Sequence, residues 1–210
     1  VQAVRGVDLT LQPGEVLAIV GESGCGKSAL CKAIMRLLPD NAGIEGKILV
    51  NGTDIAPYPE KELQKLRGRL FSMVFQDPMT ALNPVSTIGK QVMTVILKHQ
   101  KGTNEEAKKR TLDILAKVGI PDPEKRFDDY PFEYSGGMRQ RIVIAIALSC
   151  QPKILICDEP TTALDVTIQA QIIRLIKDLQ HDLGFTTVYI THDLGVVANV
   201  AERVAVLYAG

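Results

Sequence analysis

A glycine-rich loop that ends in a lysine and a hydroxyl group lies near the start of this 210-residue chain. Its residues are Gly21-Glu22-Ser23-Gly24-Cys25-Gly26-Lys27-Ser28, which match the spacing Gly-x-x-x-x-Gly-Lys-Ser. Glycines let the backbone turn its N–H groups toward an anion, and the start of the following helix adds a positive dipole. Lys27 can pair with the β- and γ-phosphates, and Ser28 can bind Mg²⁺. The motif predicts a loop that binds the phosphates of a nucleotide; the alternative is a glycine-rich turn at a helix start.

Two acidic residues, Asp158 and Glu159, come directly after the apolar run 154–157. In open α/β sheets, ligands bind beyond the carboxyl ends of the strands. Asp158 can therefore hold Mg²⁺, usually through water, and Glu159 can polarise an attacking water molecule as a general base. Such a pair is often only a solvated strand end, but together with the phosphate loop it favours ATP hydrolysis.

A second glycine-containing segment is Ser135-Gly136-Gly137-Met138-Arg139-Gln140-Arg141, which has two adjacent glycines. Ser135 is a good helix N-cap, and the two glycines expose the first N–H groups of the helix that follows. The segment is either an ordinary capped helix or a second anion site. Because one phosphate loop already serves one nucleotide, a second anion site would bind a nucleotide held by another subunit.

Alternating strands and helices must position these groups, and this alternation predicts an α/β fold with a mainly parallel sheet. Apolar runs and alternation predict strands over residues 7–11, 15–20, 46–50, 71–75, 153–157, 186–190 and 204–208. Helical spacing predicts helices over 27–38, 87–99, 103–118, 135–150, 166–183 and 194–201. We expect one domain over 1–210, with an N-terminal β part and an inserted helical subdomain over 77–150. Since position 1 is not methionine and residue 210 follows a predicted strand, we also expect the chain to be cut at both ends.

Charge and cysteine content limit the possible partners. Lys plus Arg and Asp plus Glu both number 24, so the formal net charge is zero and no nucleic-acid partner is expected. The four cysteines show neither C-x-x-C nor zinc spacing, and they are predicted to be reduced thiols. The longest apolar runs are shorter than the ~18 residues of a membrane span, so other subunits would have to cross a membrane.

The phosphate loop, the Ser135 segment and the acidic pair follow one another in the order found in the ATP-binding-cassette (ABC) ATPases. The chain resembles this family over essentially its whole length. Ser135 to Arg141 resembles their signature motif, and Gln76 resembles the Q-loop glutamine. Pro160-Thr161-Thr162-Ala163-Leu164-Asp165 is similar to the D-loop, and Thr191-His192-Asp193 contains what looks like the switch histidine. Each motif is weak alone, but the ordered set is specific.

The resemblance implies a head-to-tail dimer that holds ATP and Mg²⁺ between its two subunits. His192 would contact the γ-phosphate; the alternative is a partly buried loop residue. The implied catalytic residues are Lys27, Glu159 and His192, and the implied metal ligands are Ser28, Gln76 and Asp158. The nucleotide would also contact Gly21, Glu22, Ser23, Gly24, Cys25, Gly26, Ala29 and Gln76. The ATP of the partner subunit would contact Ser135, Gly136, Gly137, Met138 and Gln140, and Asp165 would lie at the dimer interface.

A narrower resemblance is to the oligopeptide, dipeptide and nickel importer subfamily. It is carried by the segment 75–84, Phe-Gln-Asp-Pro-Met-Thr-Ala-Leu-Asn-Pro, and by Tyr130-Pro131-Phe132-Glu133. This chain has Tyr134 at a position where the family usually has Leu or Phe, and Phe132 at a position where His is common. The resemblance implies a second ATPase subunit, transmembrane permease subunits, an extracytoplasmic solute-binding protein and a location at the cytoplasmic face of the membrane. The aromatic residue that stacks on adenine would precede Val1.

Three functions remain open from the sequence. The first is the ATPase subunit of a solute importer, for peptides or for nickel or another solute. The second is a soluble ABC ATPase of DNA repair, translation or iron–sulfur assembly, although no long coiled-coil insertion or basic patch is present. The third is a P-loop kinase or nucleotide switch, in which the signature segment and His192 would have no role.

Overall fold

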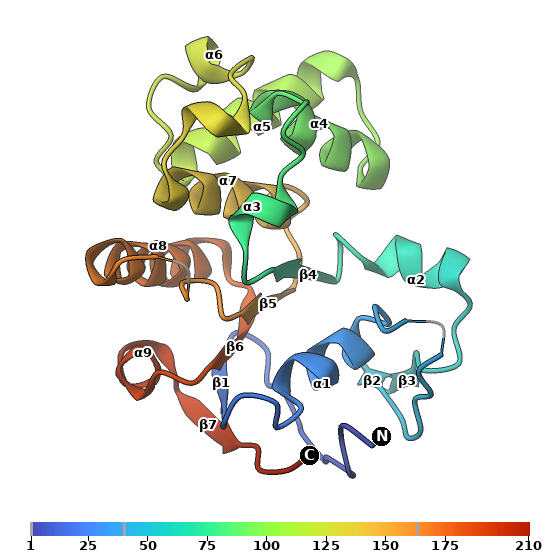
Figure 1. Cartoon of the computed structure of the whole chain (residues 1–210). Coiled ribbons are helices and arrows are strands. Elements are labelled where there is room, and N and C mark those ends of the chain that lie inside the picture. The colour runs from blue at the N-terminus through green and yellow to red at the C-terminus, as the bar shows by residue number, and fades with distance from the viewer. Residues whose placement is uncertain (1, 40, 163) are drawn as a thin grey trace.

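The fold is built on a five-stranded parallel sheet, seen in a computed structural model that describes residues 2–39, 41–162 and 164–210. Across the sheet the strand order is β4-β5-β6-β1-β7 (Figure 1). The strands are β1 (Val16–Val20), β4 (Phe71–Val74), β5 (Ile154–Asp158), β6 (Thr186–Thr191) and β7 (Arg203–Val206). All neighbouring pairs in this sheet are parallel, which confirms the predicted α/β architecture.

Two hydrophobic cores cover the two faces of this sheet, because successive strand residues point to opposite sides. On one face Ala18 and Val20 of β1 join a core built with α4 (Ile88–His99), α5 (Asn104–Lys117), α7 (Gly136–Leu148), α8 (Val166–Leu183) and α9 (Leu194–Val200). On the other face Leu17 and Ile19 pack with Cys31 and Met35, from and just beyond α1 (Lys27–Ile34). Strands β1 and β5 are almost entirely buried, which explains their apolar sequences, whereas the edge strand β7 is mostly exposed.

The N-terminal part contains less β-structure than the alternation predicts. Residues 7–11 form no strand in the described chain, and their side chains are mostly exposed. The predicted strand over 46–50 is reduced to β2 (Leu49–Val50), which pairs with β3 (Thr53–Asp54) around the predicted Asn51-Gly52 turn. Both turn residues have positive φ, as this kind of tight hairpin requires.

Helix α1 ends four residues before the predicted end at Leu38, and a distant arginine binds the carbonyl groups just beyond its last residue. The Arg67 guanidinium donates to Met35 O at 3.1 Å and to Arg36 O at 2.9 Å. Arg36 has φ +53, which turns the chain out of the helix. Arg67 follows α2 (Glu60–Leu66), a helix that the sequence analysis missed. The predicted stop at Pro39-Asp40-Asn41 includes Asp40, which lies outside the described residues.

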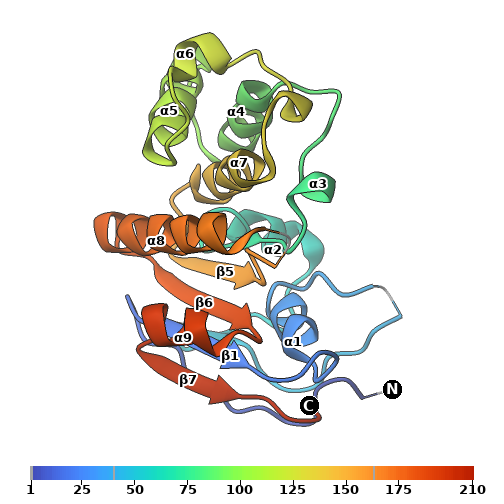
Figure 2. The same ribbon diagram turned by 60° about the vertical axis from the view of Figure 1, so that its left-hand side comes forward.

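Between β4 and β5 the chain is helical, and these helices gather on one side of the sheet (Figures 1 and 2). Besides α4, α5 and α7, this region holds the short helices α3 (Pro78–Ala81) and α6 (Pro123–Arg126) and the 3-10 turn Pro131–Glu133, none of which was predicted. Helix α5 begins at a capping box between Thr103 and Glu106. A separate subdomain over 77–150 remains a prediction.

Helix α8 has the predicted bounds, and α4, α5, α7 and α9 differ from theirs by at most two residues at either end. None of the helices in the described part of the chain is long and apolar enough to span a membrane.

Candidate nucleotide-binding site

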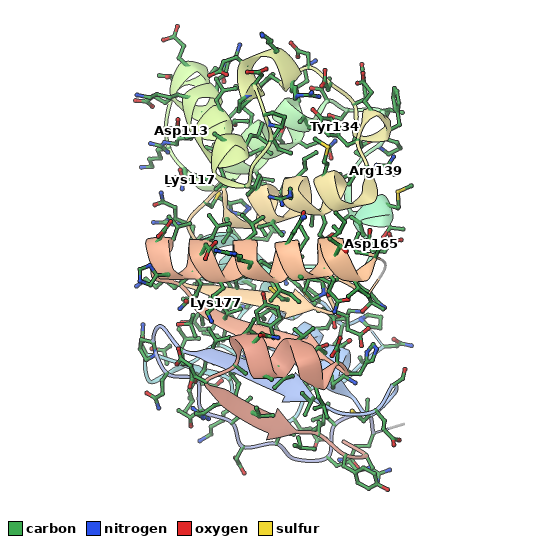
Figure 3. The ribbon with its side chains drawn as sticks, turned by 90° about the vertical axis from the view of Figure 1, so that its left-hand side faces the viewer. Asp113, Lys117, Tyr134, Arg139, Asp165 and Lys177 are labelled. Atoms are coloured by element: carbon green, nitrogen blue, oxygen red, sulfur yellow. The ribbon has the colours of Figure 1, made fainter. Side chains whose placement is uncertain are left out.

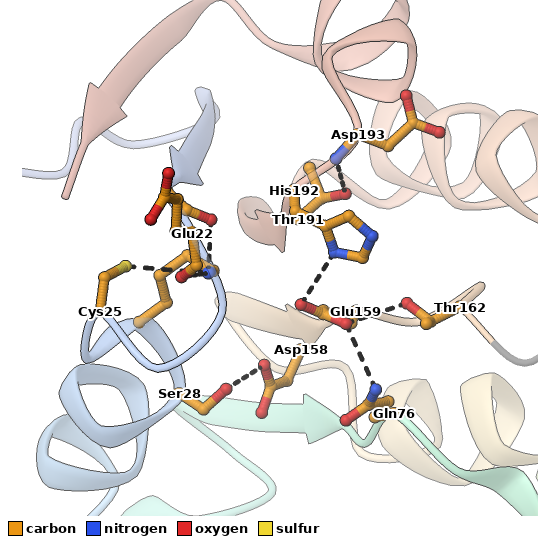
Figure 4. Close-up of polar contacts among 12 residues, drawn as sticks. Glu22, Cys25, Ser28, Gln76, Asp158, Glu159, Thr162, Thr191, His192 and Asp193 are labelled. Carbon is orange, nitrogen blue, oxygen red and sulfur yellow. Dashed lines mark hydrogen bonds and ion pairs between the residues drawn. The ribbon is translucent and has the colours of Figure 1, made fainter. Parts of the chain in front are cut away.

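Four parallel strands bring the glycine loop, the acidic pair, Gln76 and His192 to one edge of the sheet. Strand β1 leads into the glycine loop, and Gln76 comes two residues after β4. Strand β5 ends in Asp158, and His192 directly follows β6. Because all these strands run in the same direction, their carboxyl ends meet, and Figure 4 shows the side chains there facing one another.

The glycine loop has the backbone that its sequence predicts. Gly24 has φ +81 and Gly26 has φ +104, both in the left-handed region, and Gly26 is the N-cap of α1. A Cβ at Gly26 would collide with the carbonyl oxygen of Ala3, so glycine is required there for space as well as for conformation. The first N–H groups of α1 therefore start at a loop that can approach a ligand closely.

The Lys27 ammonium group is held inside this loop. Its Nζ donates to Gly21 O at 2.7 Å and to Glu22 O at 2.8 Å, and only 5% of the residue is exposed. Cys25 Sγ lies 3.8 Å from the same Nζ. Backbone carbonyls thus fix a buried positive charge at the start of α1, where an anionic phosphate would be stabilised.

Ser28 and Asp158 are in direct contact across the site. Ser28 Oγ donates to Asp158 Oδ1 at 2.7 Å, and Asp158 is 6% exposed. Burial raises the pKa of the Asp158 carboxyl above its usual value, against the Ser28 hydrogen bond and the nearby charges of Lys32 and Lys27, which lower it. This oxygen pair is what Mg²⁺ prefers in proteins.

The pair would be only part of a magnesium site. No group of three or more His, Cys, Asp or Glu residues is placed to hold a metal within the described ranges. Mg²⁺ commonly takes one or two protein oxygens and completes its octahedron with water and substrate phosphates. Ser28 and Asp158 fit that pattern, whereas the Gln76 amide nitrogen is directed at Glu159.

Glu159 lies at the centre of a cluster of hydrogen bonds (Figure 4). Its Oε2 accepts from Gln76 Nε2 at 3.3 Å and from Thr162 Oγ1 at 3.0 Å, and its Oε1 lies 3.2 Å from His192 Nδ1. The Glu159 side chain is 17% exposed and that of His192 58% exposed. The structure therefore joins the predicted base to both Gln76 and His192.

The predicted signature segment lies elsewhere, where the starts of α7 and α8 meet. Ser135 is the N-cap of α7, as predicted, and its hydroxyl accepts from Met138 N at 3.4 Å. A Cβ added to Gly137 would lie 2.5 Å from Ile168 Cγ2, so the close approach of the two helices requires glycine. Figure 3 shows Arg139 and Asp165 near the same ends of these helices.

Two residues predicted to face a second subunit are placed differently by this chain: Gln140 is buried, and Asp165 caps a helix. Gln140 is 0% exposed, and its amide has no hydrogen-bond partner among the described residues. A fully buried side chain cannot reach another subunit's nucleotide in this conformation. The Asp165 carboxylate accepts from Ile168 N at 3.0 Å and caps α8. Ala163 of the same loop lies outside the described residues.

Thr162 is a functional candidate to which the sequence motifs assign no role. Its hydroxyl reaches Glu159 because the chain reverses after β5, and a three-residue spacing is the only sequence signal for that contact.

The four cysteines are free and buried, as expected for reduced thiols. Burial raises the pKa of the Cys31 thiol to about 12, which favours the protonated form over the thiolate.

Curated relatives share most of this sequence. The oligopeptide transport ATP-binding protein OppD of Bacillus subtilis (strain 168) is 59% identical over 212 residues, and the alignment covers 100% of this chain and 59% of that protein. The dipeptide transport ATP-binding protein DppD of the same strain is 56% identical, with 100% and 63% covered. The chain thus spans about three fifths of the length of these relatives.

Solved structures show the same fold. A dimeric, post-hydrolysis ATP-binding cassette bound to ADP and Pi has a TM-score of 0.84 at 33% identity, covering 99% of this chain and 87% of that one. CbiO1 from Clostridium perfringens, part of an ABC transporter complex, has a TM-score of 0.83 at 31% identity, covering 99% and 79%. The family model described as ABC transporter matches residues 4–162, which include the glycine loop, Gln76, Ser135 and the acidic pair. By its fold, its motif order and this match, the chain belongs to the ABC transporter family.

Proposed function

We propose that this chain binds and hydrolyses ATP and so powers the import of di- or oligopeptides through separate transmembrane subunits. One observation carries the ATPase proposal: the Glu159 carboxylate lies within hydrogen-bond distance of Gln76 and His192. The buried Lys27 and the Ser28–Asp158 pair lie at the same edge of the sheet. The peptide proposal is supported by relatives named for oligopeptide and dipeptide transport. These names also favour transport over a soluble, non-transport ATPase.

The glycine loop would bind the phosphates. Lys27 and the N–H groups at the start of α1 supply positive charge on one side of the site. A phosphate could replace the carbonyl groups of Gly21 and Glu22 as the partner of the Lys27 ammonium group. Gly21 to Ala29 would surround the phosphate chain, while Ser28 and Asp158 would hold Mg²⁺. A bound Mg²⁺ would neutralise part of the negative charge of the phosphates.

Glu159 would act as the general base. Its carboxylate can accept a proton from water when one lone pair is free, and the surrounding donors fix its orientation. His192 carries Nδ1 toward Glu159, which leaves Nε2 on the other side of the ring for a γ-phosphate. Gln76 lies between the base and the helical region, where it can report the position of α3 and its neighbours.

A complete site would need a second ATPase subunit. Ser135, Gly136, Gly137 and Met138 lie at the start of α7, and they would bind the ATP held by the partner. Asp165 would lie at the interface while it caps α8. We further propose permease subunits, an extracytoplasmic solute-binding protein and a peripheral location at the cytoplasmic membrane face, since the relatives are named as transport components.

Replacement of Glu159 by glutamine in the full-length protein tests the base. The Glu159→Gln variant keeps the size of the side chain but cannot accept the proton, so we expect a fall in kcat of about 10²- to 10⁴-fold with ATP binding retained. Steady-state phosphate release and nucleotide binding measure these two effects. Glu45→Gln, in an exposed loop, is the matched control and should behave like the parent.

Vesicles test the transport proposal. The full-length protein with its membrane subunits should drive ATP-dependent uptake of labelled peptides, and the Glu159→Gln complex should not. A stable complex that contains no membrane subunit, or ATP turnover that depends on nucleic acid, would contradict the proposal.

A further inference from the structure

Thr162 contacts the group on which the proposed chemistry depends. It lies in the loop between β5 and α8, and its Oγ1 donates to Glu159 Oε2 at 3.0 Å. The residue itself is exposed, so its hydroxyl could have been solvated by water instead. A hydrogen bond from a neutral hydroxyl to a carboxylate is among the stronger side-chain bonds and favours the charged acceptor.

The backbone around Glu159 brings this hydroxyl into place. Glu159 has φ +47, a left-handed conformation that is uncommon for a residue other than glycine and that clusters at functional sites. Its N–H donates to Ile190 O of β6 at 3.0 Å, which fixes this conformation to the sheet. The chain therefore turns back directly after β5, and Thr162 N donates to Glu159 O at 3.3 Å.

The other end of the same loop is also held. The Asp165 carboxylate caps α8 through Ile168 N, and Leu164 N donates to Thr161 O at 3.0 Å. Thr162 thus lies between two anchored points, on a loop whose backbone is bonded on both sides of it. This arrangement restricts where its hydroxyl can move relative to the carboxylate.

The hydrogen bonds around Glu159 leave a defined place for a proton donor. A carboxylate has about four acceptor positions. Gln76 and Thr162 occupy Oε2, and His192 with Nδ1 protonated occupies one position on Oε1. Among the described residues this leaves about one acceptor position, on Oε1, and the two donors at Oε2 prevent the carboxylate from turning it away.

We propose that Thr162 is a positioning residue for the general base: its hydroxyl holds Glu159 Oε2 so that Oε1 is presented to the attacking water. The inference rests on the proposed function of Glu159. It assigns the D-loop of this chain a role within its own subunit, through the side chain three residues after the base. The role requires the hydroxyl and not the methyl group of Thr162.

Two substitutions in the full-length protein separate these two groups. Thr162→Val keeps the branched shape and removes the hydroxyl, whereas Thr162→Ser keeps the hydroxyl and removes the methyl group. We expect Thr162→Val to lower kcat by about tenfold, the effect of losing one hydrogen bond to a charged group, with KM for ATP unchanged. Thr162→Ser should restore kcat to within about twofold of the parent.

A matched control excludes a general effect of threonine replacement. Thr94 is an exposed threonine on α4 whose hydroxyl bonds to Lys90 O within the same helix, so Thr94→Val should leave kcat unchanged. Circular dichroism melting curves should show that the Thr162 variants fold like the parent.

The outcomes distinguish this inference from the function on which it rests. If Glu159→Gln abolishes turnover but Thr162→Val keeps the parent kcat, the positioning role is wrong and the proposed base stands. If Thr162→Ser is as impaired as Thr162→Val, the methyl group or the loop matters and the hydroxyl does not. If Glu159→Gln keeps full turnover, the base assignment fails, and this inference fails with it.

Discussion

The carboxyl edge of the sheet and the junction of α7 with α8 contain the two halves of the proposed chemistry, and they are built differently. At the sheet edge, Lys27, Asp158 and Glu159 are each bonded to other proposed site residues of the same chain. At the helix junction, the Ser135 hydroxyl bonds to the backbone of its own helix, and Gly137 is closely packed against Ile168. One region is organised by polar contacts, and the other by close packing.

This difference shows how much of the proposed shared site one chain can prepare. Polar groups from four strand ends can satisfy one another before a nucleotide binds, so the sheet edge is preorganised. The start of α7 instead offers helix N–H groups and small residues, which need a ligand supplied from outside the chain. Packing therefore holds the helix junction in place, as the proposed contact with a second subunit would require.

The largest effect is expected at the sheet edge, from Lys27→Ala. The change removes the buried positive charge that is bonded to Gly21 O and Glu22 O. We expect ATP affinity to fall by about 100-fold, since charge-assisted bonds to phosphate are lost. Equilibrium binding of a fluorescent ATP analogue measures this fall. Lys109→Ala, exposed on α5, is the control, and equal affinity in both variants would show that the loop does not bind phosphate.

An intermediate effect is expected at the helix junction, from Gly137→Ala. The added Cβ would lie 2.5 Å from Ile168 Cγ2, so α7 and α8 must move apart. Overpacking of this kind costs about 1–3 kcal/mol, which a denaturant titration can measure. Gly136→Ala is the matched control, because its Cβ would meet Leu164 at an ordinary 3.5 Å. Equal stability of the two variants would show that the junction is not closely packed.

The smallest effect on folding is expected from Asp165→Ala, at the loop that connects the two regions. Loss of the α8 cap should cost about 1 kcal/mol of unfolding free energy, and Asp165→Asn, which can still cap, should cost less. If Asp165 also lies at a dimer interface, both variants should weaken the ATP-dependent dimer, measured by sedimentation. If the dimer is weakened only in proportion to the lost stability, the carboxylate is only a cap.

Long periodic segments and tight-turn residues were predictable from the sequence because their causes are local. The spacing of apolar residues sets α8, and Asn51-Gly52 sets the β2–β3 turn. The strand over 7–11 was wrong, because alternation alone does not create a pairing partner. Helix α2 was missed, and with it Arg67, whose guanidinium binds the carbonyls of Met35 and Arg36 just beyond α1, from about thirty residues away in sequence.

For the site, the sequence by itself determined which chemical groups are present: a phosphate loop, two acids after a strand, a glutamine, a histidine and a capped glycine pair. Only the tertiary structure decided which of them meet. Parallel strand order brings Gln76 and His192 to Glu159, the left-handed turn after β5 adds Thr162, and helix packing buries Gln140. The physical reason is that residue type sets what a side chain can bind, whereas strand order, backbone reversal and packing set what lies within its reach.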